Sequence, residues 1–486
     1  MKKYYYIAFT LLLILPMFSC EKWLDVSPKT EIKSDDNFEL EQGFKDALTG
    51  VYLLMIDESL YGRELTFGFT DVLAQYYTGI YQTSHAYYYP AQYDYTDNSS
   101  VSIINNIWGS AYNAIANLNE LIAQLERADK GMFTGRNYEL IKGEAYGLRA
   151  LLHFDLLRLF GESYSANPDG DAIPYVSALG TTVTATSSVS EVIDYALNDL
   201  QIAQENLLAD PVIETNSTTA TDDESYERDR FYKFNYYAVK LLMARIYLYK
   251  QDYDNAYEAA REVINQSYFV WTPETEITTS DEDSRNYILS EELVFALYDS
   301  KLRDAYTSYF TTDNGLYMND ENYEGLFELH KSGYYGDYRY TYLTELLTDV
   351  DVRFSTKLKQ PTGSGTAYLY KMPMMRLSEA YYIAAECALD EEDITQSVSY
   401  LNAVRLQRNI PDQLSESLTK AEVLDEIYKE YAKEFMCEGQ LFYYFKRRNT
   451  EYIPVPSVSG GSLTYSYVVP NYVLPLPDDE IEYGGR

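Results

Sequence analysis

The sequence predicts a mainly α-helical, all-α protein built from helix pairs, with long irregular stretches between the pairs. Two observations support this prediction. Apolar residues recur with helical spacing in several long segments, and small residues stand twelve positions apart across two short polar turns. This spacing of small side chains is typical of tetratricopeptide-like repeats, whose paired helices approach closely. We expect about four such tetratricopeptide-like helix pairs, and a generic helical bundle is the alternative.

The first helices are expected in the N-terminal half of the chain. One pair joins residues 105–127 to residues 137–160, and a helix over 190–208 could pack against 235–250. The intervening residues 209–230 are polar and acidic, which predicts a solvated loop.

The clearest pairs follow at 235–264 and from residue 377 onward. Ala244 and Ala256 are twelve residues apart, with QDYDN between their helices, and Ala385 and Ser397 repeat this spacing around the turn DEED. From residue 377 the apolar residues fall at offsets 0, 3, 4, 7, 8, 11 and 12, which places them in one stripe along a helix.

The C-terminal part begins with a helical pattern and then becomes irregular. Residues 420–447 are predicted to supply a further helix pair. Residues 455–475 contain repeated prolines and glycines, so they cannot be helical.

The N-terminus has the features of a bacterial lipoprotein signal. Two lysines precede a short apolar run over residues 7–18, and the small residue Ser19 stands directly before Cys20. Twelve apolar residues are too few to cross a bilayer but fit the core of a signal peptide. We therefore expect residues 1–19 to be removed and Cys20 to be lipidated. The alternative is an ordinary signal peptide followed by an incidental cysteine.

The charge is strongly acidic. The chain has 39 Lys and Arg against 75 Asp and Glu, a net charge of −36. Removal of residues 1–19 takes away two lysines, so the mature charge is 37 − 75 = −38. Such a surface repels phosphate backbones and anionic lipids, so we expect no nucleic-acid partner and membrane contact only through the N-terminal lipid.

No catalytic, metal or cofactor motif is evident. The sequence has no Gly-x-Ser-x-Gly elbow and no phosphate-binding glycine loop, and its three histidines are scattered. The acidic run at 222–224 lacks a calcium-loop pattern. Cys387 and Cys437 are either buried small hydrophobic residues or a disulfide pair. We predict a protein that is not an enzyme and holds no metal or cofactor.

Tyrosine is the unusual residue, with 53 Tyr against 19 Phe and 3 Trp. Many of these tyrosines must be ordinary core or surface residues. Two segments without a clear helical pattern are the richest, since residues 76–95 contain eight tyrosines and residues 306–342 contain nine. Tyrosine suits wet binding surfaces because a large ring carries a hydroxyl group.

Six sequence blocks in a fixed order resemble the SusD/RagB family of nutrient-binding outer-membrane lipoproteins. The resemblance covers nearly the whole mature chain, and KGEAYGLRALLHFDLLRLFG at 142–161 is its most specific block. Two departures are Cys437, where the family usually has a bulky residue, and the tail EYGGR. The blocks are WLDVSPKT with FELEQGFKDALTGVY, KGEAYGLRALLHFDLLRLFG, FNYYAVKLLMARIYLYKQDYDNAYEAAREVI, MPMMRLSEAYYIAAECAL with SYLNAVRLQR, EIYKEYAKEFMCEGQLFYYFKRR, and YVLPLPDDEI.

The resemblance implies one SusD-like domain over residues 20–486, with an N-terminal part at 20–230 and a C-terminal RagB/SusD part at 231–486. It also implies that an irregular, loop-rich ligand-binding subdomain is attached to the four helix pairs. The protein is then expected to be lipid-anchored at the surface of the outer membrane. Such a protein is the lid of a SusC-like TonB-dependent barrel transporter, to which it delivers a captured nutrient.

In this family, aromatic side chains from two loop regions hold the ligand, and these places correspond to the two tyrosine-rich segments. A sugar ring packs its C–H face on an aromatic ring, while its hydroxyl groups need polar neighbours. The resemblance therefore implies six ligand-binding residues: Tyr76, Tyr77, Tyr81, Tyr306, Tyr309 and Tyr317.

Three functions remain open at this point. The first is glycan capture for uptake, the second is the same machine carrying peptides, and the third is a helical-repeat scaffold that binds only proteins. The scarcity of Trp weakens the glycan hypothesis slightly, because Trp offers the broadest stacking surface.

Overall fold

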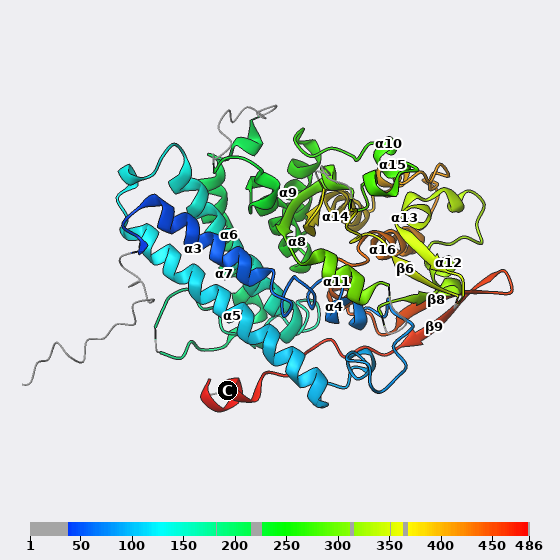
Figure 1. Ribbon diagram of the computed structural model, residues 1–486, viewed down its shortest axis with the longest axis horizontal. Helices are drawn as coiled ribbons and strands as arrows, with labels where there is room; N and C mark the ends of the chain where they lie inside the picture. Colours follow the sequence, from blue (N-terminus) through cyan, green and yellow to red (C-terminus); the bar gives the residue numbers. More distant parts are fainter. Residues whose placement is uncertain are drawn as a thin grey trace, which may run out of the picture.

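Helices dominate the computed structural model, which confirms the predicted mainly α-helical class (Figure 1). The structure describes residues 37–180, 182–214, 226–311, 315–349, 351–362 and 368–484. The predicted signal peptide and Cys20 lie outside these residues. Within them, no helix is both long enough and apolar enough to cross a bilayer.

Helices α3, α5, α6 and α7 lie together on one side of the molecule (Figure 1). The long helix α5 packs against both α3 and α6, and α7 packs against α6 and α8. The predicted pair of 105–127 with 137–160 is therefore present, but α5 begins earlier because Asp97 caps it by accepting a hydrogen bond from the Ser99 backbone N–H. The helices are α3 (Glu41–Met55), α5 (Asn98–Arg127), α6 (Asn137–Phe160), α7 (Val189–Leu207) and α8 (Tyr236–Tyr249).

Two helix pairs follow the predicted boundaries closely. They are α8 with α9 (Tyr253–Asn265), and α14 (Leu377–Asp390) with α15 (Ile394–Gln407). Ala244, Ala256, Ala385 and Ser397 are fully buried, and the Ser397 hydroxyl donates to the Ala385 carbonyl at 2.7 Å. The small residues thus lie where the paired helices touch. Their assignment as tetratricopeptide-like repeats stays a prediction.

The predicted helical segment 420–447 contains two helices with a bend between them, α16 (Lys420–Glu434) and α17 (Leu441–Arg447). Cys437 and Gly439 adopt positive φ angles of 66° and 69°. Only glycine fits at position 439, because an added Cβ would lie 2.2 Å from the Leu65 carbonyl oxygen.

A buried carboxylate joins this bend to the N-terminal half of the chain. Asp71, in the short helix α4 (Phe69–Leu73), accepts hydrogen bonds from the backbone N–H of Cys437 at 2.7 Å and of Gly439 at 3.1 Å. Asp71 is fully buried, and burial raises the pKa of its carboxyl well above the usual value. The bend and α4 therefore form one packed unit.

The irregular part contains short helices and small antiparallel sheets that the sequence did not predict. The segment 306–342 was expected to be a loop, yet it includes parts of three short helices. These are α11 (Leu302–Tyr309), α12 (Asp320–Leu326) and α13 (Tyr338–Thr341). Beside them lie the pair β3 (Leu293–Tyr298) with β7 (Lys371–Arg376), and the sheet of β4 (Met318–Asn319), β6 (Val352–Ser355) and β5 (Thr344–Leu347).

Residues 455–475 are not helical, as predicted, and most of the segment up to residue 468 belongs to a hairpin that the sequence did not predict. Strands β8 (Ile453–Ser459) and β9 (Ser462–Val468) pair around Gly460 and Gly461, whose φ angles are 58° and 80°. Two consecutive positive φ angles are typical of the tight turn that joins hairpin strands. The hairpin extends from the edge of the molecule (Figure 1).

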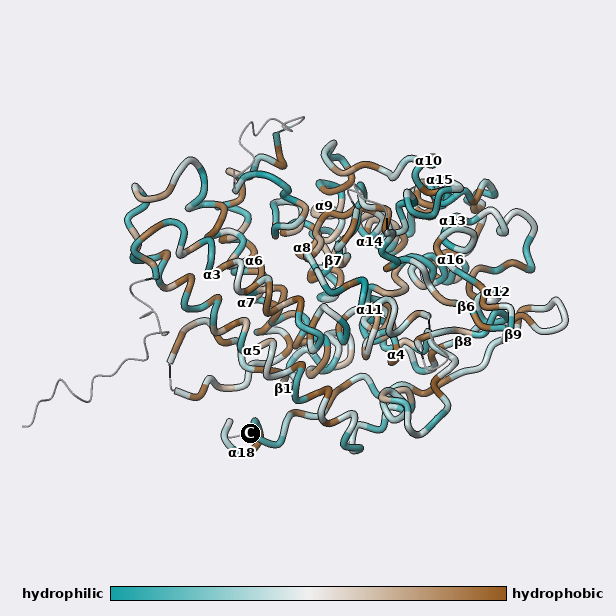
Figure 2. Tube along the Cα trace, in the orientation of Figure 1, coloured by the Kyte–Doolittle hydropathy of each residue, from teal (hydrophilic) through white to brown (hydrophobic). Residues whose placement is uncertain are grey.

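The core follows from the amphipathic pattern of the helices. Along α5, hydrophobic and hydrophilic residues alternate in the tube of Figure 2, and its buried side chains form one stripe. By contrast, α6 is buried almost all round because α3, α5, α7 and α8 surround it.

Both cysteines in the described part of the chain are buried, and they form no disulfide. Burial raises the pKa of the Cys437 thiol to about 12 and that of Cys387 further. The sequence left two possibilities open for Cys387 and Cys437, and the structure shows that both are buried small residues and not a disulfide pair.

Candidate ligand-binding site

The two tyrosine-rich segments lie side by side. The backbone N–H groups of Thr78 and Gly79 donate to the Tyr317 carbonyl at 3.1 and 3.4 Å. In return, the Asn319 backbone N–H donates to the Thr78 hydroxyl at 2.8 Å. These hydrogen bonds join loops about 240 residues apart in the sequence into one surface.

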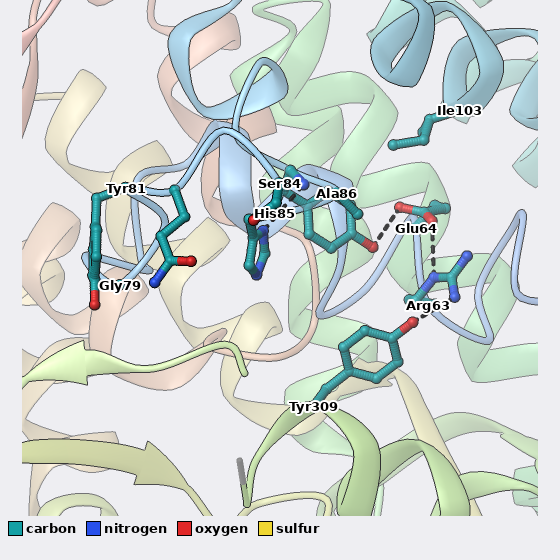
Figure 3. A pocket seen from close by; sticks show the side chains of 11 residues that line it. Arg63, Glu64, Gly79, Tyr81, Ser84, His85, Ala86, Ile103 and Tyr309 are labelled. Carbon is teal, nitrogen blue, oxygen red and sulfur yellow. Dashed lines mark hydrogen bonds and ion pairs between the residues drawn. The ribbon is translucent and has the colours of Figure 1, made fainter. Parts of the chain in front are cut away.

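A cavity of about 320 Å³ opens beside this junction (Figure 3). Tyr81 lies at one end of the cavity, the Arg63–Glu64 pair lies at the other, and His85 lies between them. Its walls are formed by Arg63, Glu64, Gly79, Tyr81, Gln82, Ser84, His85, Ala86, Tyr87, Ile103 and Tyr309.

A network of charged and phenolic groups forms one end of the cavity. Arg63 donates through Nε to Glu64 at 2.8 Å and through a terminal nitrogen to the Tyr309 hydroxyl at 2.7 Å. Glu64 also accepts hydrogen bonds from the Tyr87 hydroxyl at 2.9 Å and from the Phe69 backbone N–H at 3.2 Å. Burial raises the pKa of the Glu64 carboxyl. This end is a fixed polar wall, since each of these side chains is held by at least one other.

The opposite end is exposed and rich in neutral polar groups. The Tyr81 side chain is 66% exposed, and the neighbouring Gln82 and Ser84 are also exposed. His85 accepts a hydrogen bond from the Tyr87 backbone N–H through Nδ1 at 3.1 Å, which assigns the proton of the neutral ring to Nε2. An aromatic face beside amide, hydroxyl and imidazole groups suits a ligand with both C–H faces and hydroxyl groups.

Two of the six predicted tyrosines line this cavity. Tyr81 presents its exposed ring at the mouth, and the half-buried Tyr309 forms the wall beside Arg63. Tyr309 also borders a second cavity of about 260 Å³ on the side of α11, and Arg63 is shared between the two. These two tyrosines come from the two different tyrosine-rich segments.

The other four tyrosines have structural contacts. Tyr76 is 2% exposed and donates its hydroxyl to the Ala432 carbonyl at 2.7 Å, and Tyr77 donates to the Phe67 carbonyl at 2.8 Å. Tyr306 is buried and stacks on Phe310. Tyr317 is buried as well. In this conformation Tyr76, Tyr306 and Tyr317 offer no free ring face to a ligand, so we assign them to the core.

Sequence reasoning did not single out the polar residues of the cavity. Gln82, Ser84 and His85 lie inside the segment 76–95, so polar residues among clustered tyrosines were the available signal. Arg63 and Glu64 lie outside both tyrosine-rich segments, and no sequence pattern marks them.

Comparison with known proteins agrees with the resemblance. Residues 22–248 match the SusD-like family model described as "Starch-binding associating with outer membrane". Two similar curated proteins, both from Formosa agariphila, are SusD-like protein P38, 23% identical over 301 residues, and SusD-like protein P2, 26% identical over 272 residues. These alignments cover 60% and 54% of this chain, and 51% and 46% of those proteins. The chain thus spans about half the length of the curated relatives it matches.

Solved structures share the fold over most of the chain. A SusD superfamily protein from Bacteroides thetaiotaomicron superposes with a TM-score of 0.70 at 22% identity, covering 92% of this chain and 98% of that one. Surface glycan-binding protein A from the same organism, solved with laminarihexaose, superposes with a TM-score of 0.63 at 15% identity, covering 91% of this chain and 97% of that one. With the family model over residues 22–248 and the curated relatives, these findings support the resemblance to the SusD/RagB family, and the solved structures show that the fold is shared.

Proposed function

We propose that this protein is a cell-surface nutrient-binding lipoprotein that captures an oligosaccharide in the cavity between Tyr81 and Tyr309. It then delivers the ligand, as a lid, to a partner TonB-dependent barrel transporter of the SusC type. Cys20 carries the lipid anchor, and residues 20–486 act as one domain. The family description and the glycan complex of a structural relative support the choice of a sugar ligand.

The observation that carries this proposal is the pairing of an exposed aromatic ring with neutral polar groups. The Tyr81 ring is available for the C–H face of a sugar, and Gln82, Ser84 and His85 offer hydrogen bonds to its hydroxyl groups. Tyr309 closes the other side of the same cavity.

The cavity suits binding rather than hydrolysis. Glycosidases use two carboxyl groups on opposite sides of the bond that they cleave. Among the described residues that line this cavity, Glu64 is the one carboxylate, and Arg63, Tyr87 and Phe69 already engage it. We therefore propose that the protein does not transform its ligand.

A screen of the purified protein against oligosaccharides and peptides tests the proposal. We expect binding to at least one oligosaccharide, and we expect the bound sugar to be recovered unchanged. Binding of peptides alone would favour the second function that the sequence left open. A protein that binds neither, yet is recovered from cells with a protein partner other than a barrel transporter, would favour the scaffold.

A further inference from the structure

A second tyrosine-lined cavity, of about 380 Å³, lies on a different part of the molecule. It is formed by α3, by the segment 226–233 and by the end of β3, and it shares no lining residue with the cavity at Tyr81. Four tyrosines surround it, and its charged residues are two cations and one anion. They are Tyr52, Tyr226, Tyr232 and Tyr298, with Arg228, Lys233 and Asp229.

Two of these tyrosines are held in place by one buried carboxylate. The hydroxyl groups of Tyr52 and Tyr226 both donate to Glu144, at 2.8 and 2.9 Å. Glu144 is fully buried, and its other oxygen accepts a hydrogen bond from Arg230 at 2.7 Å. Burial raises the pKa of both tyrosines well above the usual value, so they remain neutral donors. The rings are therefore fixed before any ligand arrives.

Lys233 stands over these two fixed rings. Its ammonium nitrogen lies 5.5 Å from the ring centre of Tyr52 and 4.9 Å from that of Tyr226, which are cation–π distances. Burial lowers the pKa of Lys233. No carboxylate of the described residues lies within ion-pair distance of Lys233. By contrast, the buried Lys240 pairs with Glu262 at 2.9 Å.

The charge around Lys233 leaves it available to an anion. Glu144 and Asp210 both pair with Arg230, and Asp229 borders the cavity without forming an ion pair with Lys233. A partly desolvated cation without an anionic partner gains most from a ligand that supplies one. Elsewhere the strongly acidic chain repels anions, so a cationic cavity is a distinct feature of this protein.

The mouth of the cavity adds an aromatic surface. Tyr298 is 53% exposed, and its ring meets that of Tyr232 edge to face at 5.9 Å. An exposed ring that lines the same cavity as Lys233 suits a cyclic ligand that carries a negative group. Such a ligand can pack its ring on tyrosine while its anion meets the ammonium.

We propose that this cavity is a second ligand site, which binds an anionic group carried on a sugar ring, either a carboxylate or a sulfate ester. Lys233 binds the anion, and Tyr298 with Tyr232 contacts the face of the ring. This site is separate from the capture cavity of the proposed function. The proposal of a second site does not depend on whether the cavity at Tyr81 binds an oligosaccharide.

Titration of the full-length protein with three single sugars tests the proposal: glucuronic acid, glucose 6-sulfate and uncharged glucose. We expect at least one charged sugar to bind about tenfold more tightly than glucose, and its affinity to fall as salt is raised. The two charged probes distinguish a carboxylate site from a sulfate site. Equal binding of all three sugars, or binding of none, would overturn the proposal.

Variants then locate the binding. Lys233→Met should weaken binding of the charged sugar about tenfold, whereas Lys233→Arg and the control Lys240→Met should retain it. Tyr298→Ala, which removes an exposed ring, should weaken it too, and this variant decides the matter if Lys233→Met fails to fold. Tyr81→Ala should leave it unchanged. Undiminished binding by a folded Lys233→Met, or by Tyr298→Ala where that variant decides, would show that the charged sugar does not bind in this cavity as proposed.

Discussion

Gly79 lies directly against the ring of Tyr317. A Cβ atom added to Gly79 would stand 2.3 Å from Cζ of that ring, far inside van der Waals contact. The backbone N–H of Gly79 also donates to the Tyr317 carbonyl. This close approach holds the loop that carries Tyr81 against the loop that follows Tyr309.

Substitution of Gly79 should separate the two loops. We expect Gly79→Ala to lower the free energy of unfolding by about 1–3 kcal/mol, because a rigid buried ring must move. It should also weaken oligosaccharide binding by displacing Tyr81. Denaturant unfolding and a binding titration measure the two effects. Gly50→Ala is the matched control, because a Cβ added at this position would contact nothing within 4 Å. We expect it to stabilise helix α3, since alanine favours the helix more than glycine does. Equal stability of both variants would contradict this account.

Tyr81 and Tyr76 should respond differently to the same truncation. Tyr81→Ala should weaken oligosaccharide binding by about 1 kcal/mol, or about fivefold, with little change in melting temperature. Tyr76→Ala should cost about 3 kcal/mol of stability, because a buried aromatic side chain leaves a cavity. Thermal unfolding and titration of both variants check this contrast. Tyr335→Ala, which removes a ring that is 62% exposed outside the cavity, is the control for Tyr81→Ala.

Acid should remove the stabilisation that Glu430 contributes. Burial alone would raise the pKa of Glu430, but Lys433, Arg339 and Arg405 hold it at about 2, below its ordinary 4.5. Because the folded pKa lies below the unfolded one, the stabilisation is complete above about pH 4.5 and is lost as the pH falls towards 2.

We therefore expect Glu430→Gln to lower the free energy of unfolding at neutral pH by about 3 kcal/mol, because it leaves buried cations without their partner. Between pH 4.5 and 2 the variant should lose less further stability than the native protein. Urea unfolding across this range measures both effects, and the exposed Glu321→Gln provides the control. Parallel pH profiles for the native protein and Glu430→Gln would show that this carboxylate does not drive the acid sensitivity.

Cys20 should determine attachment to the membrane. We expect Cys20→Ser to abolish incorporation of labelled fatty acid and to move the protein from the membrane fraction to the soluble fraction, since no lipid can then be attached. Ser19→Ala keeps a small residue before the cysteine and should behave as the native protein does. Retention of Cys20→Ser in washed membranes would argue for another anchor.

The sequence predicts local pairing well and distant contacts poorly. The α8–α9 and α14–α15 pairs were predictable because Ala244, Ala256, Ala385 and Ser397 mark their contact within a short stretch of chain. By contrast, the hydrogen bond from Asn319 to Thr78 joins residues 241 positions apart, and no spacing pattern in the sequence predicts this contact.

The binding residues could be predicted only to the level of a segment. Tyr76 and Tyr81 are five positions apart in a stretch without regular structure, yet one is buried and the other is 66% exposed. A helix or strand has a period that separates inner from outer faces, but an irregular loop has none. Arg63 and Glu64 lie outside both tyrosine-rich segments, and only tertiary packing brings them to the cavity.

The hydrogen bonds from Cys437 and Gly439 to Asp71 also have a consequence for folding. They join positions 366 and 368 residues apart, so the short helix α4, close in sequence to the loop of Tyr81, is completed by a much later part of the chain. Contacts this distant in sequence form late, because a long loop must close first. A chain that ended before residue 437 would lack the two backbone donors of the Asp71 carboxylate, so the support of α4, beside the loop of Tyr81, depends on residues more than 360 positions later.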